Sequence, residues 1–355
     1  MKIAQIIGFY KDFSPEVVWG ITGVAYDLTE ELVKRGHEVT AFAPKNSKTS
    51  ALLPEWAPPA ILKDKRIPPD EEARNFVGKI YSIRIIEEAK KFDIIHNHWL
   101  GTIPYLRLMQ RPAITTLHGG GFTLGDKIVA KFCPEASYVA IAKHIIRKSP
   151  EFNYAGIVYN GINLSKFHFS DNQDNQKDHL CWLGRADPEK GLDIAIKIAK
   201  KSNNKLLIGA IIGPERQEYF DKKIKPLIDN KQIILKGEIK REQREIFLGS
   251  AKALLMPIQW EEPFGLVVIE AMACGTPVIA FRKGSMEELI IDGKNGFVVD
   301  NEKEMIEAVK DIDKIDRKEC RRYVEEHFSV SKMADGYEKV YQKIITKQCN
   351  KKNGK

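Results

Sequence analysis

The sequence predicts an α/β protein with two doubly wound domains, each built around a parallel sheet, that face each other across a cleft. A length of 355 residues suits about two domains with a core each. Short apolar runs alternate with helical patterns, which is typical of parallel sheets covered by helices. Residues 170–178 (SDNQDNQKD) contain no apolar residue and mark the clearest boundary. We therefore expect domains at residues 1–168 and 169–328, with a helix over residues 329–347 that crosses back onto the first domain.

The first half contains six apolar runs that are short enough to be strands. They cover Lys2–Gly8, Glu38–Ala43, Asp93–His96, Ala113–Leu117, Ser137–Ala142 and Gly156–Tyr159. Between the first two runs a helix is expected, because apolar residues recur there at helical spacing: Ile21, Val24, Ala25, Leu28 and Leu32. Gly36 ends this helix. Residues 54–69 contain five prolines, so we expect an irregular excursion in place of a regular element.

After the polar boundary the same alternation starts again. The expected strands are Leu180–Leu183, Leu206–Ile212, Gln232–Lys236, Ala253–Met256, Pro277–Phe281 and Gly296–Val299. The last helical pattern carries one apolar stripe, formed by Met333, Tyr337, Val340, Tyr341 and Ile344, so this helix must pack against another element. In doubly wound sheets, ligands bind beyond the carboxyl ends of the strands, and the motifs described below fall there.

Composition and cysteine usage indicate a globular protein of a reducing compartment. Hydrophobic residues make up 43% and charged residues 29% of the chain. No apolar run approaches the ~20 residues that a membrane-spanning helix needs, and the opening MKIAQIIGFYKDF lacks the cleavage site of a signal peptide. The five cysteines are scattered without Cys-x-x-Cys spacing, which argues against a disulfide framework or a zinc site. We expect a cytoplasmic protein.

The net charge of +8 arises from residues of both signs that mostly alternate along helical faces, except at the end of the chain. Residues 342–355 contain five lysines and no acidic residue. We expect a frayed, solubilising end there. The alternative is a docking patch for anionic lipid or another polyanion, which would allow peripheral contact with the inner face of the membrane. Clustered arginines with interleaved aromatic residues are missing, so no nucleic-acid partner is expected.

A first candidate site lies in Cys181–Asp193, which reads CWLGRADPEKGLD. A strand is expected to end at Gly184 and Arg185, and a helix to begin near Gly191. Lys190 stands at the start of this helix, although the helix dipole favours negative charge there. Arg185 and Lys190 beside a helix N-terminus are explained if an anion such as a diphosphate binds between them. The alternative is an ordinary turn with two solvated cations.

A second candidate site is residues 261–281, EEPFGLVVIEAMACGTPVIAF. Pro263 suits the first position of a helix over residues 264–273, which would place Glu262 at its N-terminus and Glu270 inside its apolar body. Eight helical residues span about 12 Å, more than the carboxyl separations of about 5–9.5 Å that glycosidases use. An acid and nucleophile pair is therefore disfavoured. A helix cap for Glu262, a buried salt bridge for Glu270, and two hydrogen-bond acceptors for one elongated ligand stay open.

These motifs resemble family 4 retaining glycosyltransferases of the GT-B fold. EPFGLVVIEAMACGTPVIA is similar to the Glu-x7-Glu signature of the family, GRADPEKGLD to its diphosphate-binding element, and YNGIN (residues 159–163) to its Asn-Gly interdomain hinge. The resemblance is strong from residue 156 to residue 345 and weak in the first half. It implies two Rossmann-like domains and a nucleotide diphosphate sugar as co-substrate, with no metal and no other cofactor.

The resemblance also implies roles for individual residues. Arg185 and Lys190 would hold the donor diphosphate, Glu270 would accept hydrogen bonds from the ribose, and Glu262 would contact the transferred sugar. The backbone N–H groups of Phe264 and Gly265 would help to hold sugar and phosphate. The donor-binding set implied by the resemblance is completed by Leu266 and Gly20.

In the first half, TTLHGGG places His118 where the family has a histidine that faces the donor sugar. The implied catalytic set is therefore Glu262, His118, Arg185 and Lys190. The alternative for His118 is a strand-end residue hydrogen-bonded to a loop. The glycine-rich loop of the family usually opens with Gly-Gly, whereas this chain has Trp19–Gly20, so Trp19 is a candidate for shaping an acceptor site.

Two patterns resemble metal motifs, but no metal site is expected at either. His96 and His98 alternate at a strand end, and no acidic or cysteine cluster nearby completes a set of ligands. The stretch from Asp311 to Asp313 imitates an Asp-x-Asp motif, but it lies in a polar helical pattern and is expected to be solvated surface.

The expected reaction is retaining transfer of a hexosyl group to an acceptor hydroxyl. UDP-sugars such as UDP-glucose are favoured over GDP-mannose as donors, and the acceptor is a small molecule, a glycan or a lipid-linked compound. Arg185, Lys190 and the helix N-terminus would stabilise the departing diphosphate without a metal. The alternatives are a nucleotide-sugar epimerase of the same fold and a non-catalytic polyanion-binding protein. A dinucleotide-dependent oxidoreductase is disfavoured, because no complete Gly-x-Gly-x-x-Gly follows the first strand.

Overall fold

The computed structural model describes residues 1–16, 20–169 and 178–352, which belong to two compact units. The first unit combines Met1–Gly161 with the chain from Val330 onward, and the second is Ile162–Ser329. The sequence-based division lay at residues 168 and 169. The segment before it belongs to the second unit because Ile162 bridges to Ser329 and the Phe167 carbonyl accepts a hydrogen bond from Arg321. The polar linker, residues 170–177, lies outside the described residues.

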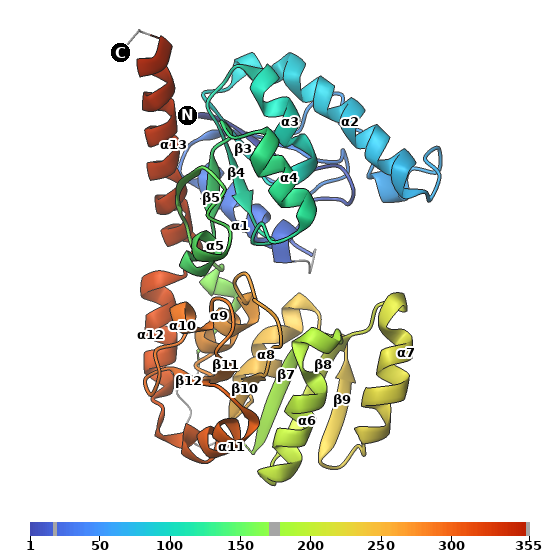
Figure 1. The fold of residues 1–355 in the computed structure, drawn as a ribbon, viewed down its shortest axis with the longest axis vertical. Coiled ribbons are helices and arrows are strands. Elements are labelled where there is room, and N and C mark those ends of the chain that lie inside the picture. Colours follow the sequence, from blue (N-terminus) through green and yellow to red (C-terminus); the bar gives the residue numbers. More distant parts are fainter. Residues whose placement is uncertain (17–19, 170–177, 353–355) are drawn as a thin grey trace. The chain divides into compact units, whose positions relative to one another are not determined.

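The first unit contains a parallel sheet in the order β2-β1-β3-β4-β5-β6, of which Figure 1 labels β3, β4 and β5. Its strands are β1 Lys2–Ile6, β2 Glu38–Phe42, β3 Ile94–Asn97, β4 Ala113–Leu117, β5 Tyr138–Ala140 and β6 Tyr154–Ile157. Its helices are α1 Gly20–Lys34, α2 Glu71–Glu88, α3 Ile103–Leu106, α4 Leu124–Phe132, α5 Lys143–Lys148 and α13 Val330–Lys352. Strand β2 lies on one side of β1 in the sheet, and β3 and the strands after it lie on the other side. The switch point of this sheet therefore lies between β1 and β3.

The second unit is a parallel sheet in the order β12-β11-β10-β7-β8-β9. Its strands are β7 His179–Arg185, β8 Lys205–Ile211, β9 Ile233–Gly237, β10 Ala253–Met256, β11 Val278–Phe281 and β12 Gly296–Val299. Its helices are α6 Leu192–Lys201, α7 Gln217–Tyr219, α8 Arg244–Gly249, α9 Leu266–Ala273, α10 Met286–Leu289, α11 Glu302–Asp311 and α12 Arg317–His327. The switch point lies between β7 and β10, which are neighbours.

Burial explains why the strands could be predicted. Each predicted strand overlaps an observed strand, and β10 and β11 are buried at every position. Strands covered on both faces are continuous apolar runs, which a sequence shows directly. The proline-rich residues 54–69 contain only a short 3₁₀ turn at Ile61–Lys63, as expected for an irregular excursion.

The predicted packing of the last helix is confirmed. All five residues of its apolar stripe are buried, and α13 contacts α1, β4 and β6. The helix continues to Lys352, so the expectation of a frayed end is wrong for the described part of the tail. The physical reason is that Ile344, which is buried, carries the apolar stripe into this segment.

The pattern did not predict α2, which is one of the longer helices. Only Gly78, Ser82 and Ile85 of α2 are buried, whereas Phe76, Ile80 and Ile83 are exposed. Because its apolar residues occupy two sides of the helix, no single stripe marks it in the sequence.

Candidate functional site

Two helices begin beside each other at the switch point of the second sheet. Helix α6 follows β7 and helix α9 follows β10, and these strands are paired. The residues that precede the two helices, Gly191 and Gly265, have left-handed backbones with φ of 69° and 84°. Neither glycine can cap its helix with a side chain, so the positive ends of both helix dipoles lie at this edge without a carboxylate or hydroxyl cap.

Gly191 determines how closely the two connections approach. A Cβ atom on Gly191 would lie 2.0 Å from the carbonyl oxygen of Pro257, far inside van der Waals contact. The N–H group of Gln259 donates a hydrogen bond of 2.7 Å to the carbonyl of Glu189, which joins the same two connections. The segment after β7 is therefore fixed against the segment after β10, and only glycine fits at the contact.

The structure brings two predicted residues, Lys190 and Glu262, into an ion pair. Lys190 Nζ lies 2.5 Å from Glu262 Oε2, although the residues are 72 positions apart. Trp260 Nε1 donates to the same carboxylate oxygen over 2.9 Å, and the ammonium group lies 4.6 Å from the centre of a Trp260 ring. The exposed fractions of the Lys190 and Glu262 side chains are 17% and 12%, so both retain access to solvent. The sequence analysis missed Trp260, although its position just before the two glutamates of WEEPFG was a signal.

A second pair of cations shares one buried carboxylate. Arg185, at the end of β7, lies 2.7 Å from Asp187 Oδ2, and Arg216 Nε donates to Asp187 Oδ1 over 2.9 Å. Asp187 is buried, whereas Arg185 and Arg216 are 50% and 42% exposed. Arg216 follows β8, the neighbour of β7, and was not predicted because it belongs to a different segment of the sequence.

The predicted position of Glu262 on a helix is wrong. Helix α9 begins at Leu266, three residues after Pro263, because Gly265 has a left-handed backbone. The segment before it is held from outside: Ser285 donates from its N–H group to the Glu262 carbonyl over 3.1 Å and from its hydroxyl to the Phe264 carbonyl over 2.5 Å. The two glutamates therefore do not lie along one helix, and the helical spacing between them does not apply.

Glu270 has a protein partner. Its side chain is 8% exposed, and Arg244 Nη1, from α8, donates to its two oxygens over 2.8 and 2.9 Å. The buried salt bridge that the sequence left open is present, so a bound ribose is not needed to explain the burial of this carboxylate. Each oxygen still has a further lone pair that can accept a hydrogen bond.

The remaining predicted residues of the second unit lie where this loop enters α9. Phe264 is buried with its ring against Phe328, and Leu266 is partly buried at the first position of α9. In the first unit Gly20 is the exposed first residue of α1. Trp19, the candidate acceptor-site residue, lies outside the described residues.

His118, which is partly buried in the first unit, is one end of a chain of polar side chains whose other members are buried. It follows β4, and its Nε2 lies 2.9 Å from Nδ1 of His98, which follows β3. His98 Nε2 lies 2.7 Å from Oε1 of Gln5 on β1, and the ring centres of His96 and His98 are 4.0 Å apart, with the two rings tilted by 35°. The chain therefore crosses the switch point of the first sheet. His118 therefore follows a strand, as the sequence indicated. Its hydrogen bond to a second histidine was not indicated by the sequence.

The C-terminal helix completes this chain. Tyr341 on α13 is hydrogen-bonded to His96 Nδ1 over 2.8 Å and accepts from Gln5 Nε2 over 3.3 Å. Thr116 lies 2.7 Å from His96 Nε2 and 2.9 Å from the hydroxyl of Tyr337. The hydroxyl groups of two residues in the apolar stripe of α13 therefore serve as hydrogen-bonding partners for the β strands.

Burial keeps these histidines neutral. It lowers the pKa of His118 to about 4, and it lowers the pKa of His96 and His98 well below 6.5, with a smaller contribution from neighbouring histidines. With the carboxamide oxygen of Gln5 as the acceptor, Nε2 of His98 carries its proton and Nδ1 of His98 accepts from His118. Nδ1 of His118 is then the nitrogen with a free lone pair, and it can accept a hydrogen bond from a hydroxyl group.

The residues of both metal-like patterns make other interactions in the structure. In the parts of the chain that the structure describes, no group of three or more His, Cys, Asp or Glu side chains is arranged to hold a metal ion. His96 and His98 use their ring nitrogens in the hydrogen bonds given above. Asp311 and Asp313 are exposed and form ion pairs with lysines, as expected for solvated surface.

Comparison with known proteins identifies the family. Residues 165–328 match the family described as Glycosyl transferases group 1, and residues 18–166 match Glycosyltransferase Family 4. The chain is a family 4 glycosyltransferase. An uncharacterized glycosyltransferase of Methanocaldococcus jannaschii is 28% identical over 295 residues, covering 73% of this chain and 78% of that protein. The D-inositol 3-phosphate glycosyltransferase of Arthrobacter sp. is 26% identical over 308 residues, covering 72% of this chain and 70% of the relative.

Solved structures confirm the GT-B fold of this glycosyltransferase. Sucrose-phosphate synthase from Thermosynechococcus elongatus has a TM-score of 0.78 at 19% identity, covering 97% of this chain and 99% of that one. Anabaena HepE in complex with UDP-glucose has a TM-score of 0.71 at 16% identity, covering 98% of this chain and 100% of that one. At these identities the likeness is one of fold.

The contact at Gly191 can be tested against a matched glycine. Gly191→Ala and Gly237→Ala both place an alanine on a left-handed backbone, which costs about 1–2 kcal/mol of the free energy of unfolding. A Cβ atom on Gly237 has no atom within 4 Å, whereas one on Gly191 collides with Pro257. Gly191→Ala should therefore lose more stability in urea unfolding of the second unit and also separate Lys190 from Glu262. Equal losses in the two variants would contradict the close contact.

The protonation of the histidine chain gives a second prediction. His118 should stay neutral down to about pH 4 in long-range ¹H–¹⁵N NMR spectra, whereas an unfolded histidine titrates near 6.5. Between these values the unfolded chain binds more protons, so the free energy of unfolding of the first unit should fall as the pH falls, by up to about 1.4 kcal/mol per pH unit for His118. A His118 midpoint near 6.5 in the folded protein contradicts this account.

Proposed function

We propose that this glycosyltransferase moves a hexosyl group from a nucleotide diphosphate sugar to an acceptor hydroxyl, with retention at the anomeric carbon. The observation that carries the proposal is the ion pair of Lys190 and Glu262 beside the open N-termini of α6 and α9. Helix N-termini and a lysine suit a diphosphate, and a solvent-accessible carboxylate next to them suits the hydroxyls of the attached sugar.

In the proposed mechanism the second unit stabilises the leaving group. Cleavage of the sugar–phosphate bond leaves negative charge on the diphosphate, and Lys190, Arg185 and the two helix N-termini compensate it. In the free protein the Lys190 ammonium group is ion-paired with Glu262. A bound diphosphate would therefore interact with an ammonium group that also contacts this carboxylate. Glu262 then accepts from the sugar, and Glu270 accepts from the ribose while Arg244 holds the Glu270 carboxylate in position through two hydrogen bonds.

The acceptor reacts on the face that the diphosphate leaves. A departing phosphate oxygen takes the proton of the acceptor hydroxyl as the new glycosidic bond forms, which gives retention without a protein nucleophile. His118 contributes from the first unit by accepting a hydrogen bond from a sugar hydroxyl at Nδ1. The proposal includes no metal ion.

A UDP-sugar such as UDP-glucose is the proposed donor, with GDP-mannose as the alternative. The proposal is supported by the likeness in fold to Anabaena HepE, which has been crystallised with UDP-glucose. The acceptor is a small molecule, a glycan or a lipid-linked compound. Because none of the five cysteines forms a disulfide, we propose a cytoplasmic location. We also propose peripheral contact at a membrane. Among the described residues, none of the helices combines the length and apolar character needed to cross a bilayer.

A panel of UDP-, GDP- and ADP-sugars in a thermal-shift assay tests the donor. A donor present at 100 times its Kd should stabilise the protein by about 2.7 kcal/mol. With the best donor and a surrogate acceptor, NMR of the product should show the anomeric configuration of the donor, and EDTA should leave the rate unchanged. An inverted product, or activity lost in EDTA, contradicts retention or metal independence. Conversion of the donor without any acceptor favours an epimerase.

The role of Lys190 can be tested against a lysine of the following helix. Lys190→Ala should lower kcat by about 100- to 1000-fold, because the leaving diphosphate loses a fixed positive charge. Lys197→Ala is the control, since Lys197 lies on α6, is half-exposed and pairs with Glu302 on the surface. Glu262→Ala should also lower transfer severely while circular dichroism shows an intact fold. Wild-type turnover in Lys190→Ala or Glu262→Ala would refute these assignments.

A further inference from the structure

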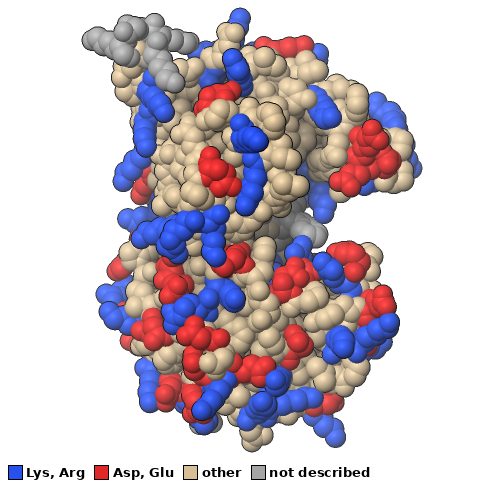
Figure 2. All heavy atoms as spheres, viewed as in Figure 1, with Lys and Arg blue, Asp and Glu red and all other residues tan. Residues whose placement is uncertain are grey.

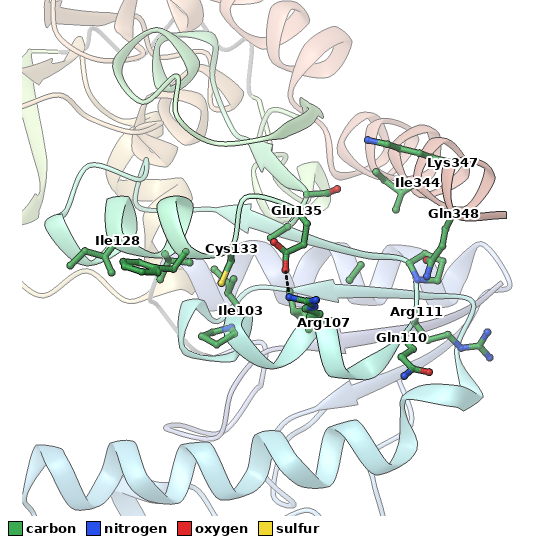
Figure 3. A pocket seen from close by; sticks show the side chains of 18 residues that line it. Ile103, Arg107, Gln110, Arg111, Ile128, Cys133, Glu135, Ile344, Lys347 and Gln348 are labelled. Carbon is green, nitrogen blue, oxygen red and sulfur yellow. Dashed lines mark ion pairs between the residues drawn. The ribbon is translucent and has the colours of Figure 1, made fainter. Parts of the chain in front are cut away.

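A surface pocket of the first unit combines an apolar lining with cationic residues. Its volume is about 680 Å³, and its walls come from α3, α4, the segments that lead into β4 and β5, and the end of α13 (Figure 3). Apolar side chains such as Ile128, Phe132 and Ile344 line it together with Arg107, Arg111 and Lys347. An apolar pocket with several cations suits a molecule that is both apolar and anionic.

The charge of this pocket is poorly compensated. Glu135 is the acidic residue that lines it, and its carboxylate lies 4.0 Å from Arg107, at the limit of an ion pair (Figure 3). The side chains of Arg107 and Glu135 are 81% and 54% exposed, so this pair is weak. Residues 100–150 contain seven lysines and arginines but two acidic residues. The surface is therefore complementary to a negatively charged partner.

Helix α4 carries an apolar stripe outward beside the pocket. Leu124, Ile128 and Phe132 are four residues apart, so they lie on one face, and their exposed fractions are 76%, 48% and 74%. Lys127 and Lys131 are exposed next to this stripe. In Figure 2 the surface of the first unit that faces the viewer is mostly uncharged and carries scattered lysines and arginines together with a few acidic side chains. An exposed apolar stripe bordered by lysines is typical of a helix that lies in a membrane interface.

We propose that α4 and this pocket dock on an anionic lipid bilayer, with Ile128 and Phe132 entering the headgroup region and Arg107, Arg111 and Lys347 contacting lipid phosphates. A second copy of the chain is a poorer occupant, because it would bring like charges together. A soluble polyanion would leave the apolar stripe uncovered. The inference deepens the peripheral membrane contact proposed above and rests on that part of the proposed function, but it does not depend on the sugar transferred.

Within the first unit, the docking surface leaves His118 uncovered. The pocket includes Ala113 and Ser137, which lie at the amino ends of β4 and β5, whereas His118 follows the carboxyl end of β4. Because these are opposite edges of the sheet, substitutions in the docking surface do not touch the residues proposed for transfer.

Helix α2 provides a matched control. Phe76 and Ile80 are also four residues apart and exposed, at 61% and 51%, but α2 contains four glutamates against three lysines and arginines. The full-length double variants Ile128→Ser/Phe132→Ser and Phe76→Ser/Ile80→Ser therefore remove the same two side-chain types from surfaces of different charge. A charge variant, Arg107→Gln/Lys347→Gln, removes the cations without altering the apolar stripe.

The experiment is flotation with vesicles of equimolar phosphatidylglycerol and phosphatidylcholine, compared with pure phosphatidylcholine. The wild type should bind the anionic vesicles and not the neutral ones, and binding should weaken with salt. The α4 double variant and the charge variant should each bind the anionic vesicles at least about tenfold more weakly than the wild type. The α2 variant should stay within about twofold of the wild type. Unfolding curves and turnover with a soluble acceptor should be unchanged in all variants. If the wild type binds the anionic vesicles but shows no turnover, the proposed reaction is contradicted and the docking surface is not.

Three results would overturn the docking proposal. They are equal binding to neutral vesicles, equal losses in the α2 and α4 variants, and a wild type that does not bind vesicles but forms an oligomer that the α4 variant dissociates. The last result would assign this face to self-association.

Discussion

The architecture of the candidate site depends on the contact between Gly191 and the carbonyl oxygen of Pro257. This contact joins the chain that leaves β7 to the chain that leaves β10, at the point where successive strands turn to opposite sides of the sheet. It is possible because Gly191 has no side chain and has a left-handed backbone. The start of α6, the ion pair of Lys190 with Glu262 and the position of Trp260 all follow from this approach.

The two units solve the problem of buried polar groups in different ways. In the second unit, charged carboxylates are paired with cations: Glu262 with Lys190, Asp187 with two arginines, and Glu270 with Arg244. In the first unit, the buried histidines beside the switch point are neutral, because burial lowers the pKa of His96 and His98 and hydrogen bonds satisfy their ring nitrogens. A set of fixed charges suits a diphosphate, and a neutral hydrogen-bonding chain suits the hydroxyls of a sugar.

The C-terminal helix α13 connects features that are far apart in the sequence. Its buried tyrosines hydrogen-bond to the histidine chain on β3 and β4 through His96 and Thr116. Near its end, Ile344 and Lys347 line the pocket beside α4. The same helix therefore stabilises the interior of the first unit and contributes to the surface that we propose for membrane docking.

The sequence by itself determined the two parallel sheets, because strands buried on both faces are continuous apolar runs and the segments between them have helical periodicity. It also located Arg185, Lys190, Glu262 and Glu270, since these polar residues interrupt such patterns at strand ends and inside an apolar helix. Only the tertiary structure decided their partners. Lys190 pairs with Glu262 and His98 with His118, because neighbouring strands of a parallel sheet bring together residues that are remote in the chain. Arg244 pairs with Glu270 because α8 packs against α9. The start of α9 was also decided there, since Gly265 and the hydrogen bonds from Ser285 hold Glu262 outside the helix.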